Sequence, residues 1–98
     1  TLGWRELKEG EEAPPSRPDG NPFNVVFVNS GDREVTLFWM SRDGGSKFYG
    51  SIAAGGQQRQ QTRPGAIWMV ADATEGKNRP LGFFRVGDRA ARAVVPGQ

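Results

Sequence analysis

Residues 23–41 read FNVVFVNSGDREVTLFWMS, and this stretch decides the fold class. Two runs rich in β-branched and aromatic residues, 23–30 and 35–41, flank the polar turn GDRE. Such residues favour strands, and each run carries apolar side chains on both of its faces, which is typical of a strand with neighbours on either side. We therefore expect two central strands of a β-sheet.

The same alternation of strand-like runs and turns continues to the end of the chain at intervals of about ten residues, which is typical of a sandwich or barrel. The turns contain RDGG and AAGG, and Asp-Gly and Gly-Gly pairs accept positive φ angles easily. No segment shows sustained helical spacing, so the chain is predicted to be all-β. Besides the two runs above, strands are expected at 47–52, 57–62, 66–72, 81–86 and 91–95.

The first 22 residues differ from the rest. Residues 8–22, KEGEEAPPSRPDGNP, hold four prolines and too little apolar surface to offset the entropy of ordering. We predict that residues 1–22 are an extended or disordered arm or linker, that 23–95 form a single β-sandwich domain, and that 96–98 are a tail. An alternative is that Trp4 and Leu7 fix part of the arm against the domain.

Composition disfavours an enzyme and a metalloprotein. The 98 residues contain no cysteine and no histidine, which removes thiolate chemistry, the commonest general base and the commonest metal ligand. The carboxylates lie in or beside predicted turns, where they commonly shape the turn. We expect no cofactor. A net charge of +2 disfavours nucleic-acid binding, and no apolar run approaches the length of a membrane span, so no membrane partner is expected. The compartment stays open.

Aromatic residues are the remaining chemistry. Trp39, Tyr49 and Trp68 lie in three different predicted strands. Each has a polar atom that needs a partner when buried, which suits a pocket with one open side. The simpler interpretation is that all large aromatic side chains belong to the core.

The strand series has a specific resemblance. The FVN of residues 27–29, Trp39 followed by the Asp-Gly turn, Tyr49, the Gly-rich loop and the GAIW of residues 65–68 appear in one ungapped register. With these features, residues 23–95 resemble the β-domain of the von Hippel–Lindau tumour suppressor family. The resemblance implies a seven-stranded antiparallel β-sandwich.

It also implies a binding site. Domains of this family bind a hydroxyproline-containing peptide in a pocket walled by two tryptophans and a tyrosine, which match Trp39, Trp68 and Tyr49. Thr62 matches the serine that contacts the hydroxyproline hydroxyl, and Arg63 follows it where the family has a tyrosine. The implied partner is a proline- or hydroxyproline-containing peptide or protein segment. No segment resembles the family's helical domain, so recruitment of a ubiquitin-ligase scaffold is not expected.

The family's histidine, which makes the second hydrogen bond to the ligand hydroxyl, is replaced by Ala66. An unmet hydrogen-bonding group costs about 1–3 kcal/mol, so the preference for hydroxyproline over proline is expected to shrink roughly ten- to a hundredfold. A relaxed proline pocket is therefore expected to survive better than a hydroxyproline-specific one.

The turn before Trp68 leaves two registers open. If Arg63, Pro64 and Gly65 all belong to the loop, Thr62 pairs with Ala66 and shares the face of Trp68; this is the register that the resemblance favours. If only Pro64 and Gly65 form the loop, Thr62 turns to the opposite face.

Two other functions also stay open. One is a structural or accessory domain of a larger protein with no ligand pocket. The other is a carbohydrate-binding module, which needs coplanar, exposed aromatic rings on one flat face.

Overall fold

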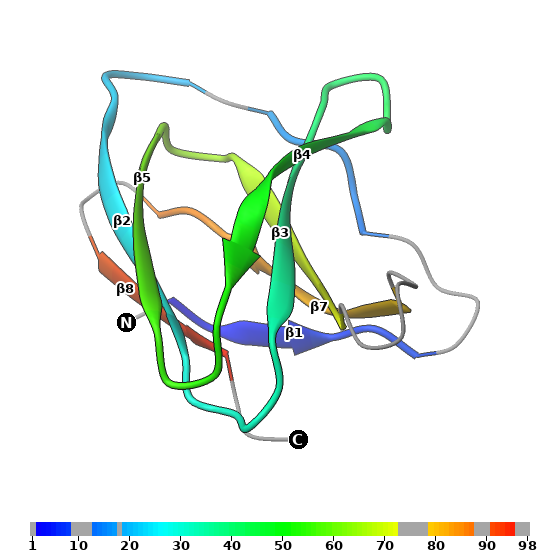
Figure 1. Ribbon diagram of the computed structural model, residues 1–98. Helices are drawn as coiled ribbons and strands as arrows, with labels where there is room; N and C mark the ends of the chain where they lie inside the picture. Colours follow the sequence, from blue (N-terminus) through cyan, green and yellow to red (C-terminus); the bar gives the residue numbers. More distant parts are fainter. Residues whose placement is uncertain (1, 9–12, 18, 73–78, 88–90, 96–98) are drawn as a thin grey trace.

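The computed structural model describes residues 2–8, 13–17, 19–72, 79–87 and 91–95. In these residues there is no helix, and the strands form two sheets that pack face to face as a β-sandwich (Figure 1). The strands are β1 (Trp4–Glu6), β2 (Phe23–Asn29), β3 (Val35–Met40), β4 (Ser46–Ile52), β5 (Gln57–Thr62), β6 (Ile67–Asp72), β7 (Arg79–Arg85) and β8 (Ala91–Val95).

The larger sheet has the order β1-β7-β6-β3-β4, and the smaller has the order β5-β2-β8. All seven predicted strands are confirmed, with ends that differ by two residues at most. The predicted strand count is wrong, because the described residues contain eight strands, the additional one being β1. The purely antiparallel arrangement is also wrong, because β8 runs parallel to β2.

β1 comes from the segment that the sequence left without regular structure. It pairs antiparallel with β7, and Trp4 packs edge-on against Phe84 with 5.1 Å between ring centroids. The indole needs a glycine opposite, since a Cβ atom at Gly82 would lie 2.3 Å from Trp4. Leu7 is buried as well. Of the two alternatives for the arm, the structure therefore has the one in which Trp4 and Leu7 pack on the domain.

Alternation along the strands builds the core between the sheets. In β2, Val25 and Phe27 are fully buried, whereas Val26 and Val28 are half-buried on the outer face. Phe27 reaches across the sandwich and contacts Trp68, with ring centroids 5.4 Å apart. Burial of these large apolar side chains is the main favourable contribution to folding.

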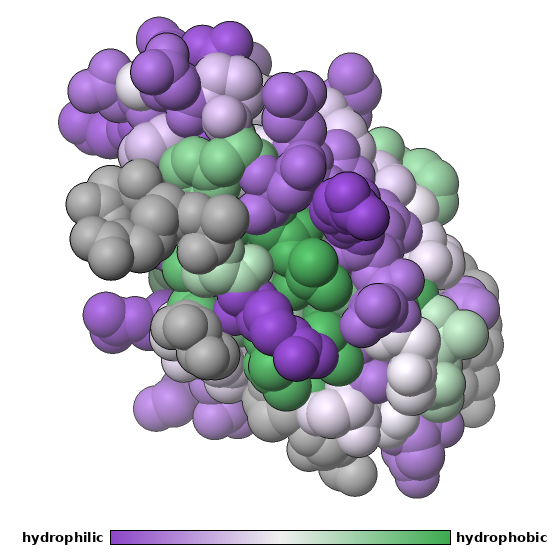
Figure 2. Space-filling model, turned by 90° about the vertical axis from the view of Figure 1, so that its left-hand side faces the viewer, coloured by the Kyte–Doolittle hydropathy of each residue, from purple (hydrophilic) through white to green (hydrophobic). Residues whose placement is uncertain are grey.

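The outer face of the smaller sheet is partly apolar. Figure 2 views the molecule from this side and shows an apolar area bordered by hydrophilic side chains. Val94 is 37% exposed, and Val26 lies in register between Arg59 of β5 and Arg92 of β8. Both arginines are exposed, so they keep this face hydrated.

Candidate functional site

The chain crosses from the smaller sheet to the larger sheet between β5 and β6, and the predicted site lies at this end of the sandwich. β5 pairs with β2 in the smaller sheet, whereas β6 lies in the larger one. The turn between them is closed by the N–H of Ala66, which donates to the carbonyl of Arg63 over 3.2 Å. Gly65 has a φ of 84°, which a glycine at the third position of a Pro-Gly turn adopts without strain.

Each register predicted for this turn is partly right. The hydrogen bond closes a turn around Pro64 and Gly65, as in the second alternative, yet Thr62 faces Trp68, as in the first. The rules for a paired hairpin do not apply here, because β5 and β6 are not hydrogen-bonded to one another. The chain changes sheets at Arg63, and the inner face of β5 turns toward Trp68.

Three of the predicted site residues are in contact. The indole N–H of Trp68 donates to Oγ1 of Thr62 over 2.9 Å. The Tyr49 ring meets the Trp68 ring edge-on, with centroids 5.0 Å apart and planes at 79°. Trp68 is only 2% exposed and Thr62 only 6%, whereas Tyr49 is half-buried. Trp68 is therefore buried, and Tyr49 is a partly exposed ring packed against it.

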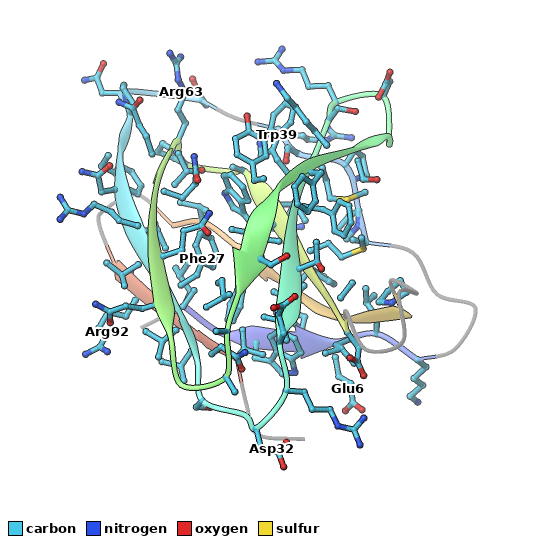
Figure 3. All side chains as sticks on the ribbon, viewed as in Figure 1. Glu6, Phe27, Asp32, Trp39, Arg63 and Arg92 are labelled. Carbon is cyan, nitrogen blue, oxygen red and sulfur yellow. The ribbon has the colours of Figure 1, made fainter. Side chains whose placement is uncertain are left out.

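The other two predicted residues lie around this group. Trp39 of β3 is the cross-strand partner of Trp68 and is half-buried. Arg63 is exposed in the turn. Figure 3 shows Trp39 and Arg63 at one end of the sandwich and Asp32 at the opposite end. The structure thus brings Trp39 to the aromatic group and leaves Arg63 at its rim.

A β-bulge aims Tyr49 at the site. Leu37 of β3 pairs with Gly50 and Phe38 with Phe48, so Tyr49 is the extra residue on β4. Gly50 has a φ of 125°, a conformation that L side chains rarely adopt. Bulges commonly redirect a side chain next to a functional site.

The structure adds polar residues that the sequence analysis did not select. Gln58, Gln60 and Thr62 alternate along the inner face of β5, and the Gln58 side-chain amide donates to the carbonyl of Tyr49 over 3.2 Å. Lys47 lies over the Tyr49 ring, with 5.5 Å from Nζ to the centroid. The period-two spacing of β5 and of Lys47 with Tyr49 is the signal that places these side chains on the site face.

Few polar groups at these residues can form further hydrogen bonds, and the Thr62 hydroxyl is the main one among them. A threonine hydroxyl has one donor and two acceptor lone pairs, and Trp68 uses one lone pair of Thr62. Ala66 is 1% exposed and contributes no polar atom. In the part of the chain that the structure describes, no group of three His, Cys, Asp or Glu residues is placed to hold a metal ion. No helix of that part is long and apolar enough to cross a membrane.

The geometry argues against a sugar platform. Carbohydrate stacking requires coplanar exposed rings, but Tyr49 and Trp68 are nearly perpendicular and Trp68 is buried. The aromatic side chains instead form a packed group, and the Thr62 hydroxyl is hydrogen-bonded to the buried Trp68. The described fold is therefore a β-sandwich with a group of aromatic side chains and the Thr62 hydroxyl at the end where β5 leads into β6.

Comparison with known proteins gives the family. The family model of the VHL beta domain matches residues 16–81, more than half of the chain, and the chain belongs to this family. The match runs from the arm into the first residues of β7 and includes all five predicted site residues. VHL beta domains are non-catalytic domains that bind protein substrates. No curated protein sequence matches this chain.

Proposed function

We propose that this chain is a non-catalytic protein-binding domain that receives a proline- or hydroxyproline-containing segment against Trp39, Tyr49 and Trp68. The observation that carries the proposal is the convergence of two half-buried aromatic side chains on the buried Trp68. Half-buried aromatic rings retain apolar area that a ligand can cover, and a proline ring is rigid and loses little entropy on binding.

Thr62 supplies the polar contact in this proposal. Its hydroxyl keeps its own proton and one lone pair after accepting from Trp68, so it can bond to one hydroxyl or carbonyl of the ligand. Ala66 leaves the second bond to a ligand hydroxyl unmade. The expected discrimination between hydroxyproline and proline is therefore small, about tenfold or less.

The edges of the sheets favour an extended ligand. Within the described part of the chain, β4 and β5 are edge strands, and both border the site. An edge strand offers backbone donors and acceptors to an added segment. Arg63 at the rim adds a positive charge for the flanking residues of that segment.

A second candidate function is a structural domain without a ligand. It is favoured by the burial of Trp68, whose polar atom already has its partner within the chain. The two candidates differ in whether Trp39 and Tyr49 become covered when a proline peptide is added.

An amide and indole NMR titration separates the two candidates. The probe is one short peptide prepared with proline and with 4-hydroxyproline. We expect shifts centred on Trp39, Tyr49, Thr62 and the Trp68 indole with both peptides, with an affinity ratio of at most about tenfold. Trp39→Ala is expected to weaken binding more than tenfold, whereas Arg92→Ala, an exposed position on β8 at the other edge of the smaller sheet, is the control. No shift at millimolar peptide favours the structural role.

A further inference from the structure

A recess lies on the opposite side of the Arg63–Ala66 turn from the aromatic side chains. Its volume is about 450 Å³, within the range of ligand pockets. It lies between the arm and the neighbouring ends of β6 and β7. Its described lining residues are Pro14, Pro15, Arg17, Gly65, Ile67 and Arg85.

Hydrogen bonds hold the arm wall of this recess in place. Oγ of Ser16, which is 1% exposed, accepts from the N–H of Ile67 over 2.7 Å and donates to its carbonyl over 3.3 Å. The N–H of Arg17 donates to the carbonyl of Gly65 over 3.0 Å, and the N–H of Asp19 donates to that of Pro64 over 2.8 Å. The arm is therefore attached like a short additional strand, and the recess is formed before any ligand binds.

The opposite wall is equally fixed. The N–H of Gly65 donates to the carbonyl of Val86 over 2.9 Å, and the N–H of Val86 donates to the carbonyl of Ala66 over the same distance. Arg85 is the register partner of Ile67 and is exposed beside this junction. The turn is thus held from both sides, which fixes the distance between the backbones of Arg17 and Arg85.

The chemistry of the lining is cationic and apolar. Arg17 and Arg85 are both exposed, no described carboxylate lines the recess, and neither arginine forms a salt bridge with a described residue. The proline rings supply apolar surface without backbone donors. A guanidinium binds a carboxylate through two parallel hydrogen bonds, and apolar walls strengthen such a contact by excluding water.

We infer that this recess is a second binding site, which takes a peptide segment carrying carboxylate side chains between Arg17 and Arg85 and apolar side chains against the prolines. It is independent of the aromatic site, because the β6 side chains alternate. Ile67 faces the arm, whereas Trp68 faces the sandwich interior. A partner can therefore contact both sides of the turn at once, or only one.

The test uses the full chain and the peptides Ac-GLEELG-NH2 and Ac-GLQQLG-NH2, which differ only in their carboxylates, with inorganic phosphate as a third probe. We expect the Glu peptide to shift the amide signals of Arg17, Gly65, Ile67 and Arg85. The Gln peptide is expected to bind at least tenfold more weakly. Raising the NaCl concentration from about 50 to 300 mM is expected to weaken the binding of the Glu peptide severalfold.

Substitutions complete the test. Arg17→Gln and Arg85→Gln are each expected to lower the affinity for the Glu peptide about fivefold or more. The control Arg92→Gln removes the same charge from the smaller sheet and is expected to change this affinity less than twofold. Both substituted side chains are exposed, and an unchanged thermal midpoint verifies the fold. Equal binding of the two peptides, equal binding of phosphate, or an equal effect of Arg92→Gln overturns the inference. The aromatic site is judged separately, by the Trp39 and Trp68 signals with the proline peptides.

Discussion

Each end of the sandwich buries a polar side chain, and the two ends use it differently. At the end away from the site, Asn29 is 1% exposed, and its side-chain amide donates to the carbonyls of Arg33, Ile52 and Ala53 over 2.6, 3.1 and 3.3 Å. Its side-chain oxygen accepts from the N–H of Gly31 over 3.1 Å. At the other end, the Thr62 side chain has one described hydrogen bond, which its Oγ1 accepts from the indole N–H of Trp68.

The difference is between a polar side chain whose hydrogen bonds are used within the fold and one that has hydrogen-bonding capacity left. Asn29 has both amide protons engaged and ties two loops to the end of β2, so it has little capacity for a ligand. Thr62 has a spare donor and a spare acceptor and lies beside half-buried rings. A buried polar group with unused capacity at an open end is the better candidate for recognition.

The largest effect is expected from Asn29→Ala. The substitution leaves three carbonyls and one N–H without this partner, and we expect a loss of about 3 kcal/mol in the free energy of unfolding. Urea denaturation followed by tryptophan fluorescence measures it. Asn24→Ala, on the exposed face of the same strand, is the matched control and should cost less than about 0.5 kcal/mol. A loss below about 1 kcal/mol for Asn29→Ala contradicts the structural role.

Local pattern was sufficient for six of the seven predicted strands, because each is rich in apolar, β-branched or aromatic residues and lies between turn residues. The polar run QQRQQT of 57–62 was predicted as a strand only from its context. β1 has only three residues, and Trp-Arg-Glu shows no periodicity. It becomes a strand because β7 offers a free edge and Gly82 makes room for Trp4. The parallel pairing of β8 with β2 is a long-range property, and no short sequence pattern specifies it.

The second-largest effect is expected from a substitution in the β-bulge at Tyr49 and Gly50 of β4. Gly50→Ala forces a side chain into a φ of 125° and places its Cβ 3.3 Å from Oε1 of Gln58. We expect a loss of about 2 kcal/mol in the free energy of unfolding. We also expect weaker binding of the proline peptide, because Tyr49 is displaced.

Gly44→Ala is the control for this variant. It also lies at positive φ, but nothing lies within 4 Å of its Cβ position. It should strain the β3–β4 turn and leave peptide affinity unchanged. If both variants weaken binding equally, the bulge has no special role in directing Tyr49.

The site could be predicted only in part, for a physical reason. The resemblance selected Trp39, Tyr49 and Trp68, and the contacts of Tyr49 and Thr62 with Trp68 bring that set together. The sequence analysis did not select Gln58, because every residue of β5 is polar. Only packing against the other sheet defines which face of β5 points inward. The turn at Arg63 combines features of both predicted registers. Both predictions assumed that β5 and β6 pair as a hairpin, whereas the two strands belong to different sheets.

The third effect is expected from Thr62→Val, which replaces the hydroxyl with a methyl group of similar shape. The buried N–H of Trp68 loses its acceptor, and we expect a loss of about 1–2 kcal/mol in the free energy of unfolding. Any preference for the hydroxyproline peptide should disappear, whereas proline-peptide binding persists. Thr62→Ser keeps the hydroxyl and should retain the preference. A preference that survives in Thr62→Val shows that another group reads the ligand hydroxyl.

The smallest effect is expected in the exposed turn between β3 and β4. The Ser41 hydroxyl and the N–H of Gly45 both donate to Oδ1 of Asp43, and they hold the pKa of that carboxyl below its usual range, with Ser41 as the larger cause. Because the pKa is lowered on folding, the stabilisation is present above the ordinary Asp pKa of about 3.9 and is lost as the pH falls through the folded value.

Ser41→Ala should therefore raise the pKa of Asp43 toward its ordinary value, as measured by carboxyl-carbon NMR titration. Asp43 is fully exposed, so the change is expected to be local and to leave the Trp68 indole signal in place. The control Ser46→Ala removes another exposed hydroxyl near the same turn and should leave the titration unaltered. If Ser41→Ala does not move the pKa, the backbone N–H groups of Gly45 and Asp43 are sufficient to lower it, and the Ser41 hydroxyl does not act on this carboxyl.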